Sequence, residues 1–308
     1  MVMTLLEASK LQSGDVIRQG VIEMFAQNSE ILRVLPFMDI PGGSYHYNLE
    51  GALPGVAFRG VNEAFPEGVG IINPQVETLR IAGGDLDVDK AIIDMHGADV
   101  RSRHEAMKVK ALSLYLGRKL IKGDSTADVR EFDGLQNRLT GSQLIQAGTT
   151  ANGSALSLIK LDELIDAVDF PNALIMSKAM ARLLSAAARS SSVGGYITYD
   201  KDEFGRRVMR YNDLQILTID HDDTGARVLD FNEAASSGTS TATSIYAVNF
   251  GDGYCVGLQN GTMQVRDLGE IDAKPVWRTR IEWLVGFATL HGRCAARLWS
   301  VGNLAVTA

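Results

Sequence analysis

The densest group of ionisable side chains in the sequence is His221-Asp222-Asp223. A histidine beside carboxylates can act as a general base, so a hydrolase that uses His221 and Asp222 is one hypothesis. The group follows an apolar run and comes just before Thr224-Gly225. Aspartates are common in such turns because their side chains hydrogen-bond to nearby backbone amides. The sequence therefore favours a turn here over a catalytic site.

Two other patterns begin like metal sites. His104-Glu105 starts like a zinc-protease helix, but Lys108 stands where the second histidine ligand is needed. The spacing Asp85-x-Asp87-x-Asp89 matches the first three ligands of a calcium loop, but Lys90 replaces the glycine and His96 the closing glutamate. We predict no metal site.

Phosphate-binding and nucleophilic motifs are also missing from the sequence. It has no Gly-Lys-Ser/Thr loop and no Gly-x-Ser-x-Gly elbow. Gly251-Asp252-Gly253 with Gly257 is close to a dinucleotide pattern, but it lies between predicted strands, which indicates a turn. We predict that the chain is not an enzyme, with no catalytic residues and no cofactor.

The amino-acid composition narrows the classes of protein that remain possible. The chain has 308 residues, 45% hydrophobic and 22% charged, which is typical of globular proteins. Its net charge of −7 argues against a protein whose main task is to grip nucleic acid. The sequence shows no secretory signal and no membrane-spanning run, and we expect Cys255 and Cys294 to be reduced and buried.

Two segments near the N-terminus have apolar stripes. Residues 13–27 predict a short helix with Ile17, Val21 and Phe25 on one face. Ile31–Phe37 is apolar and predicts an extended segment up to Pro36. Such an arm docks on its own core or on a neighbouring subunit.

Residues 41–89 predict an extended hairpin with a long irregular tip. Its arms alternate in Tyr45–Leu49 and in Val76–Ile81, and the segment is rich in glycine. It has seven acids, two bases (Arg59 and Arg80) and no lysine. A hairpin of this kind is marginal alone, so it needs a partner surface, most plausibly a basic one.

From about Asp94 to Lys122 the pattern is helical for over 25 residues and stops at Gly123. Seven bases against three acids give this segment a charge of +4. We regard it as a candidate partner for the acidic hairpin.

The rest of the chain predicts an α/β core and then mostly strands. The predicted elements are a helix at Leu158–Phe170, a buried strand at Ala173–Met176, a helix at Ser177–Arg189, strands at Val208–Arg210 and Leu214–Ile219 around Asn212-Asp213, strands at Ser244–Val248 and Tyr254–Leu258, a tight hairpin turn at Asn260-Gly261, and long strands over Val276–Leu298 with a pairing turn near Gly292.

This order of elements resembles the major capsid protein of tailed bacteriophages, the Hong-Kong-97-type fold. Local segments similar to that family are Glu131–Leu135 after the long helix, Ala173–Ser177 before a helix, Asn249–Tyr254 as a turn, and Arg278–Trp283 with the apolar run that follows. The resemblance covers essentially the whole chain.

The resemblance implies an α+β fold and a division into named regions. These are an N-terminal arm (1–40), an extended hairpin or E-loop (41–92), a P-domain with the spine helix (93–190), an A-domain (191–275) and returning P-domain strands (276–308). It implies a capsid protein that self-assembles into an icosahedral shell around double-stranded viral DNA.

The implied partners follow from that function. Copies of the chain form hexamers and pentamers, with a separate scaffolding protein, a portal and a cement protein, and with DNA only non-specifically. Assembly in the host cytoplasm and residence in the virion are implied, without a membrane. The absence of lysine from residues 41–89 excludes the hairpin-lysine cross-link of some relatives.

Candidate subunit-interface residues are Arg59, Glu63, Glu67, Ile17, Val21 and Phe25. The alternative within this fold is an encapsulin-like nanocompartment shell; the alternative from another class is the hydrolase that uses His221 and Asp222.

Overall fold

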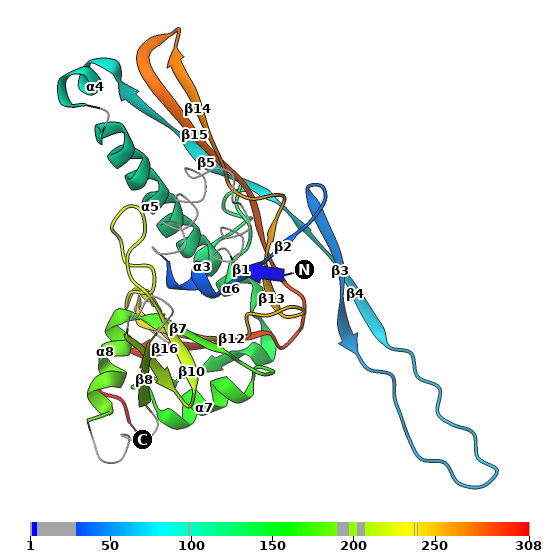
Figure 1. Ribbon diagram of the computed structural model, residues 1–308. Coiled ribbons are helices and arrows are strands. Elements are labelled where there is room, and N and C mark those ends of the chain that lie inside the picture. The colour runs from blue at the N-terminus through cyan, green and yellow to red at the C-terminus, as the bar shows by residue number, and fades with distance from the viewer. Residues whose placement is uncertain are drawn as a thin grey trace.

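A computed structural model describes residues 2–4, 29–97, 99–189, 197–201, 207–236, 238 and 240–307 (Figure 1). The helices are α3 (Glu30–Val34), α4 (Lys90–His96), α5 (Asp99–Lys122), α6 (Leu135–Arg138), α7 (Leu158–Asp166) and α8 (Lys178–Ala187), with a 3₁₀ turn η1 (Gly141–Gln143). The strands are β1 (Val2–Thr4), β2 (Pro36–Asp39), β3 (Ser44–Ala52), β4 (Ile71–Thr78), β5 (Arg80–Asp89), β6 (Leu144–Gln146), β7 (Ala173–Ser177), β8 (Ile197–Lys201), β9 (Arg207–Tyr211), β10 (Leu214–Ile219), β11 (Glu233–Ala234), β12 (Ser240–Val248), β13 (Cys255–Gln259), β14 (Gln264–Ile271), β15 (Lys274–Thr289) and β16 (Ala295–Gly302).

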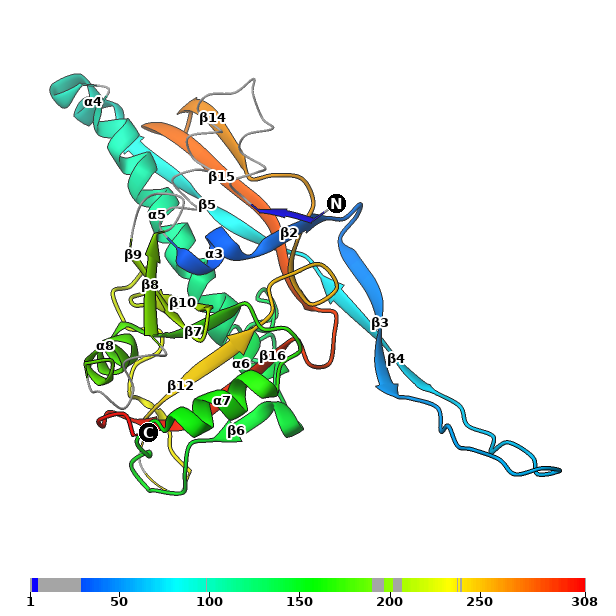
Figure 2. The same ribbon diagram turned by 60° about the horizontal axis from the view of Figure 1, so that its bottom comes forward.

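Two mixed sheets and one free hairpin make up the α+β fold. One sheet has the order β1-β2-β13-β15-β14, and β5 also pairs with β15. The second has the order β6-β16-β12-β7-β10-β9-β8, and β11 also pairs with β12. Figure 2 shows α7 and α8 beside the second sheet, while α5 lies along the first. None of the described helices combines the length and apolar character that crossing a membrane requires.

The long helix α5 is the axis of the larger core. Its buried stripe includes Val109, Leu112, Leu116 and Leu120, which pack with residues of β13, β15 and α3. At about 1.5 Å per residue its 24 residues span about 36 Å. The prediction of one continuous helix from Asp94 was wrong at the start, because the chain turns at Gly97 with φ of +85° and separates α4 from α5.

The segment after β1 also differs from its prediction. Ile31–Phe37 was expected to be extended, but α3 occupies Glu30–Val34. The Ser29 hydroxyl accepts a bond from the Leu32 amide at 3.4 Å and so caps the helix. One short turn of helix lets Ile31 and Leu32 both face the core, where they are almost fully buried.

Two of the predicted hairpin turns do not form. Strands β13 and β14 both pair along the same edge of β15. Gln259 pairs with Val285 and Gln264 pairs with Glu282, so Asn260-Gly261 lies in a bulge along one arm and is not a hairpin turn. The hairpin turn is 272–273, since Ile271 pairs with Lys274. The segment near Gly292 joins β15 of the first sheet to β16 of the second, so no pairing turn forms there.

An ionic ladder fixes β5 to β15 in register. Arg278 and Arg280 each form a two-bond ion pair with the aspartate opposite: Arg278 Nε lies 2.6 Å from Asp87 Oδ1, and Arg280 Nε lies 2.6 Å from Asp85 Oδ1. These hydrogen bonds lower the pKa of both carboxyl groups. The bond that Arg101 donates lowers the pKa of Asp267 in the same way.

We expect acid to loosen this end of the first sheet. Because the folded pKa values of Asp85, Asp87 and Asp267 are lowered, the ladder is complete at neutral pH and is lost as pH falls below about 4. Hydrogen exchange of peptides from β5, corrected for its intrinsic pH dependence, should increase below that pH while β7 stays protected. An Asp85→Asn, Asp87→Asn variant should already show fast β5 exchange at pH 7. Unchanged protection of β5 at pH 3 would contradict this prediction.

Candidate assembly surfaces

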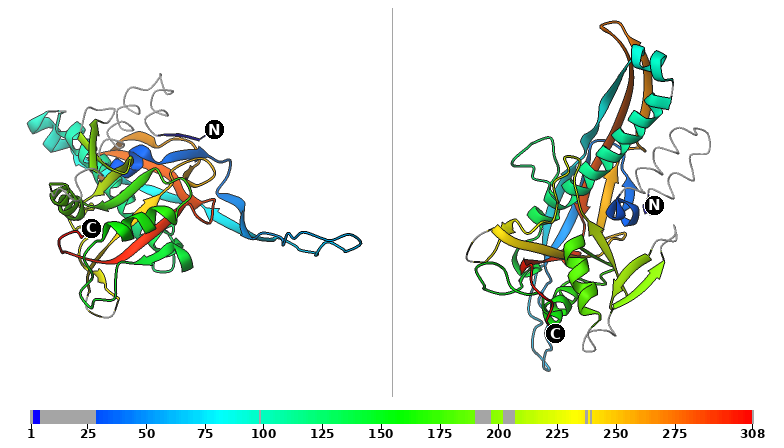
Figure 3. Two further views of the ribbon diagram at one scale, coloured as in Figure 1. Left: turned by 90° about the horizontal axis from the view of Figure 1, so that it is seen from below. Right: turned by 90° about the vertical axis from the view of Figure 1, so that its left-hand side faces the viewer.

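The hairpin β3–β4 projects from the body as an arm (Figures 1 and 3). Its tip carries apolar side chains that are exposed to solvent. Among the strands of the described residues, these two pair only with each other. Large apolar side chains that stay exposed along the tip are Leu53, Val56, Phe58, Val61, Phe65 and Val69. Phe58 is completely exposed. An apolar surface of this extent marks a contact site for another molecule.

The structure brings Arg59 and Glu63, two of the predicted interface residues, together inside the tip. The Gly60 amide donates to Glu63 Oε2 at 2.8 Å, and Arg59 Nη1 donates to the Glu63 carbonyl at 3.2 Å. The Arg59 guanidinium also lies 5.0 Å from the centre of the Phe65 ring. These contacts organise the turn at the tip. Glu67 is exposed and has no ion pair with any described residue.

The other predicted interface residues, Ile17, Val21 and Phe25, lie outside the described residues, as does the predicted helix 13–27.

Three acids of the segment 41–89 find basic partners within their own chain. Glu77 is paired with Arg138, and Asp85 and Asp87 are paired with the arginines of β15. Asp89 accepts a bond from the Ala91 amide at 2.8 Å and caps α4. The calcium-like spacing is therefore used for ion pairs and a helix cap. Among the described residues no group of histidine, cysteine and carboxylate side chains could hold a metal ion.

Most cations at the carboxyl end of α5 also have partners within the chain. The ion pairs of this helix are Arg101 with Asp267 at 2.7 Å and Glu105 at 3.2 Å, Arg118 with Asp222 at 3.0 Å, Lys122 with Glu233 at 3.0 Å, and Lys119 with Glu131. Arg103, Lys108 and Lys110 form no ion pair with any described residue. Lys108 borders a groove of about 390 Å³ between α5, β5 and the loop after α5.

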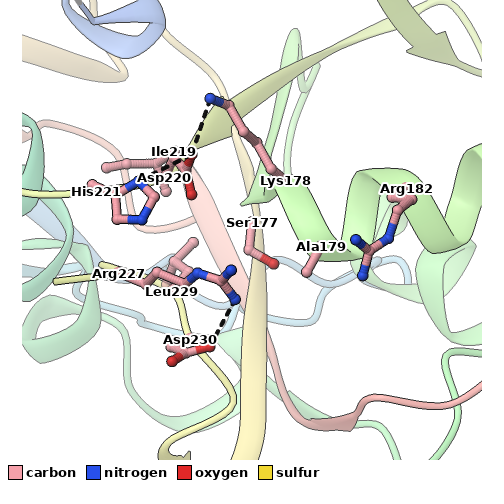
Figure 4. Close-up of a pocket in the computed structure, with 10 residues that line it drawn as sticks. All are labelled: Ser177, Lys178, Ala179, Arg182, Ile219, Asp220, His221, Arg227, Leu229 and Asp230. Atoms are coloured by element: carbon pink, nitrogen blue, oxygen red, sulfur yellow. Dashed lines mark ion pairs between the residues drawn. The ribbon is translucent and has the colours of Figure 1, made fainter. Parts of the chain in front are cut away.

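The hydrolase hypothesis places His221 and Asp222 together, but the structure assigns them to separate networks. His221 Nδ1 lies 3.1 Å from Asp220 Oδ2, and a dashed line marks this pair in Figure 4. Asp222 is buried, and its carboxylate accepts bonds from the Thr224 and Ala226 amides and from Arg118. Burial opposes ionisation of Asp222, but the bond that the Thr224 hydroxyl donates at 2.6 Å, together with the bonds just named, outweighs it and lowers the pKa.

The pocket beside His221 has a volume of about 170 Å³ and contains internal ion pairs. Lys178 and His221 both point to Asp220, and Arg227 points to Asp230 (Figure 4). The Ser177 hydroxyl accepts a bond from the Met180 amide at 3.2 Å, so it caps α8. The structure does not place Asp222 behind His221, as a base and its orienting carboxylate require.

Comparison with known proteins identifies the family. The family model of the major capsid protein GP7 matches residues 12–173, which is more than half of the chain. None of the curated proteins matches the sequence significantly.

Solved structures match over most of the chain. The SrpI encapsulin complex of Synechococcus elongatus superposes with a TM-score of 0.65 at 18% identity, covering 91% of this chain and 89% of that one. The capsid of a native GTA particle gives a TM-score of 0.64 at 12% identity, covering 89% and 91%. The Mycobacterium phage Bobi structure gives 0.61 at 11% identity, covering 89% and 90%. These likenesses show the Hong-Kong-97-type fold, and with the family-model match they place the chain in the family of the bacteriophage major capsid protein GP7.

Proposed function

We propose that this capsid protein builds the hexamers and pentamers of an icosahedral head that encloses double-stranded DNA. Membership in the capsid family supports a self-assembling shell and residence in the virion. The observation that carries the proposal is the hairpin, whose apolar tip extends away from its own subunit. A surface of this kind is covered when a neighbouring subunit packs against it.

The regions of the fold have distinct proposed tasks. The hairpin region (41–92) reaches over neighbours with its tip. In the arm region (1–40), α3 and β2 pack into the core and the first sheet of their own subunit. The P-domain (93–190 with 276–308) forms the wall, and the A-domain (191–275) surrounds the symmetry axes. Both sheets cross these boundaries, since β12 pairs with β7 and β16, and β14 pairs with β15. In this proposal β5 is shared, because it continues the hairpin but pairs with β15 of the wall.

Other components complete the proposed head. A separate scaffolding protein, a portal and a cement protein assist assembly, which takes place in the host cytoplasm. The DNA is held without sequence preference, since the chain is acidic and many of the cations on α5 are neutralised by its own carboxylates. Contacts with phosphate would then be weak and salt-sensitive.

Electron microscopy of particles from infected or expressing cells tests the function. Closed icosahedral shells that contain DNA would support it. Shells that contain a protein cargo would favour the encapsulin-like alternative, for which the fold shared with the SrpI encapsulin is the supporting observation. Single subunits under all assembly conditions would refute both.

The groove beside Lys108 is the proposed receiver of the tip from a second copy. Its lining combines apolar side chains, among them Ile81, Ala111 and Leu112, with charged ones that include Lys108. The tip offers the matching chemistry, with exposed apolar side chains and the unpaired Glu67. In this proposal the burial of apolar side chains supplies most of the binding free energy, while the charges determine how the tip aligns in the groove.

We expect charge reversal at the tip to impair assembly. Glu67→Lys should reduce the yield of shells or lower their melting temperature, because it opposes Lys108 with a like charge, and Lys108→Glu in the same chain should restore part of the loss. Adding Glu63→Lys should have a larger effect, since Glu63 also holds the tip turn. Light scattering during assembly and calorimetry of shells provide the measurements. Normal assembly of the Glu63→Lys, Glu67→Lys double variant would show that these acids do not contribute to the subunit interface.

A further inference from the structure

A buried ion pair joins the base of the hairpin to the body of the subunit. Arg138, the last residue of α6, faces Glu77 on β4 with both of its terminal nitrogens. Nη2 lies 2.9 Å from Oε2, and Nη1 contacts Oε1. Such a two-bond pair fixes direction as well as distance, because the guanidinium and the carboxylate must be coplanar.

Arg138 is also held by two backbone carbonyls in the body of the subunit. Its Nε donates to the Asp133 carbonyl at 2.7 Å, and Nη2 also donates to the Phe287 carbonyl on β15 at 2.9 Å. The guanidinium lies 5.6 Å from the centre of the Phe287 ring. Arg138 therefore connects the hairpin to both the loop after α5 and the long strand of the first sheet.

The pair is screened from solvent. The side chains of Arg138 and Glu77 are 11% and 18% exposed. The Tyr47 hydroxyl on β3 donates to Glu77 Oε1 at 3.4 Å, so both strands of the hairpin take part. Burial, followed by the charge of Glu77, raises the pKa of Tyr47, which keeps its hydroxyl protonated as a donor.

Other contacts at the base are mainly apolar. Leu79, with Tyr45 and Tyr47, packs against Ile40 and Leu258. Apolar contacts hold the base in place but do not prescribe an angle, because they are non-directional. Backbone bonds also hold the base: the Ile40 amide donates to the Gln259 carbonyl at 2.8 Å, and β5 begins to pair with β15 at Arg80. The side-chain bonds at this point come from Arg138, Tyr47 and Asn260, whose Nδ2 donates to the Gly42 carbonyl at 2.9 Å.

We propose that Glu77, Arg138 and Tyr47 form a clamp that sets the direction in which the hairpin projects from the subunit. They are positioning residues, distant from the apolar tip that makes the contact. The right-hand view of Figure 3 shows the hairpin running past the body, and a change of angle at its base is amplified at the tip. The consequence for assembly rests on the proposed function, but the angle itself is a property of the single subunit.

Spin-label distances in the unassembled subunit test the clamp. Labels on Ile72→Cys in β4 and Ile159→Cys on α7 report the angle, and both positions are exposed. The native Cys255 and Cys294 are buried free thiols, as predicted, so labels should attach selectively. We expect Glu77→Gln to widen the distance distribution at least two-fold, and the Asp230→Asn control, which removes an exposed ion pair with Arg227 away from the hairpin, to leave it unchanged.

A second variant covers the case in which Glu77→Gln does not fold. Glu77→Gln with Arg138→Gln removes both buried charges together, so no unpaired ion remains. A widened distribution in a subunit with unchanged circular dichroism supports the clamp, and a distribution equal to that of the wild type overturns it. Failure of the wild-type chain to form shells would refute the proposed function without altering this measurement.

Discussion

Deletion of residues 55–70 is expected to abolish shell formation and to leave a folded subunit. The segment lies beyond the paired strands and its residues are exposed. The side-chain hydrogen bonds of Arg59 and Glu63 join residues within the tip. Its removal therefore costs the subunit little, but it removes Val56, Phe58 and Phe65 from the contact with a neighbour. Circular dichroism and thermal unfolding report the fold, while size-exclusion chromatography and microscopy report assembly.

A glycine-serine linker of equal length in place of residues 55–70 is the matched control. It keeps the reach of the hairpin but lacks the apolar side chains, so it should fail to assemble in the same way. Shells of normal yield from the linker variant would show that the tip is a spacer. Loss of the folded signal in the deletion variant would show that the tip belongs to the core.

Replacement of Glu233 by glutamine is expected to give the second large effect, a loss of about 3 kcal/mol in the free energy of unfolding. Glu233 is buried, and its carboxylate lies 3.0 Å from Lys122 at the end of α5 and 2.9 Å from Arg297 on β16. The Ser244 hydroxyl also donates to it. Glutamine leaves two cations without a counter-charge, and one of them, Arg297, is largely buried.

Denaturant unfolding of the unassembled subunit measures this loss. Asp230→Asn is the control, because it removes a 3.7 Å pair with Arg227 that is open to solvent and should cost less than about 1 kcal/mol. Equal shifts of the unfolding midpoint in the two variants would contradict the structural role assigned to Glu233. Lys122→Met with Arg297→Met in the Glu233→Gln chain should recover much of the loss, since no buried charge then remains unpaired.

Local patterns in the sequence predicted several elements correctly. Ala173–Met176 is a fully buried strand, and Ser177 caps the helix that follows it. Asn212 and Asp213 form the turn between β9 and β10 with φ of +47° and +64°, a conformation that these two residue types tolerate. The two arms of the hairpin also pair with each other, from Ser44 with Thr78 to Ala52 with Ile71. The second arm was predicted too late in the chain, because β4 ends at Thr78 and Ile81 pairs with Leu284 of β15. In each case the determining interactions lie within a short stretch of chain.

The tertiary structure alone decided which strands and charges meet across long separations. The acids of β5 carry no signal that Arg278 and Arg280, about 190 residues later, are their partners. The same holds for Glu77 and Arg138, which are 61 residues apart. The sequence by itself determined the order of the elements, the exposed character of the tip and the capsid resemblance. The tertiary structure decided which acid pairs with which arginine. The local sequence around an acid is the same whichever distant arginine it binds, and only the packing of the sheets brings one particular pair within bonding distance.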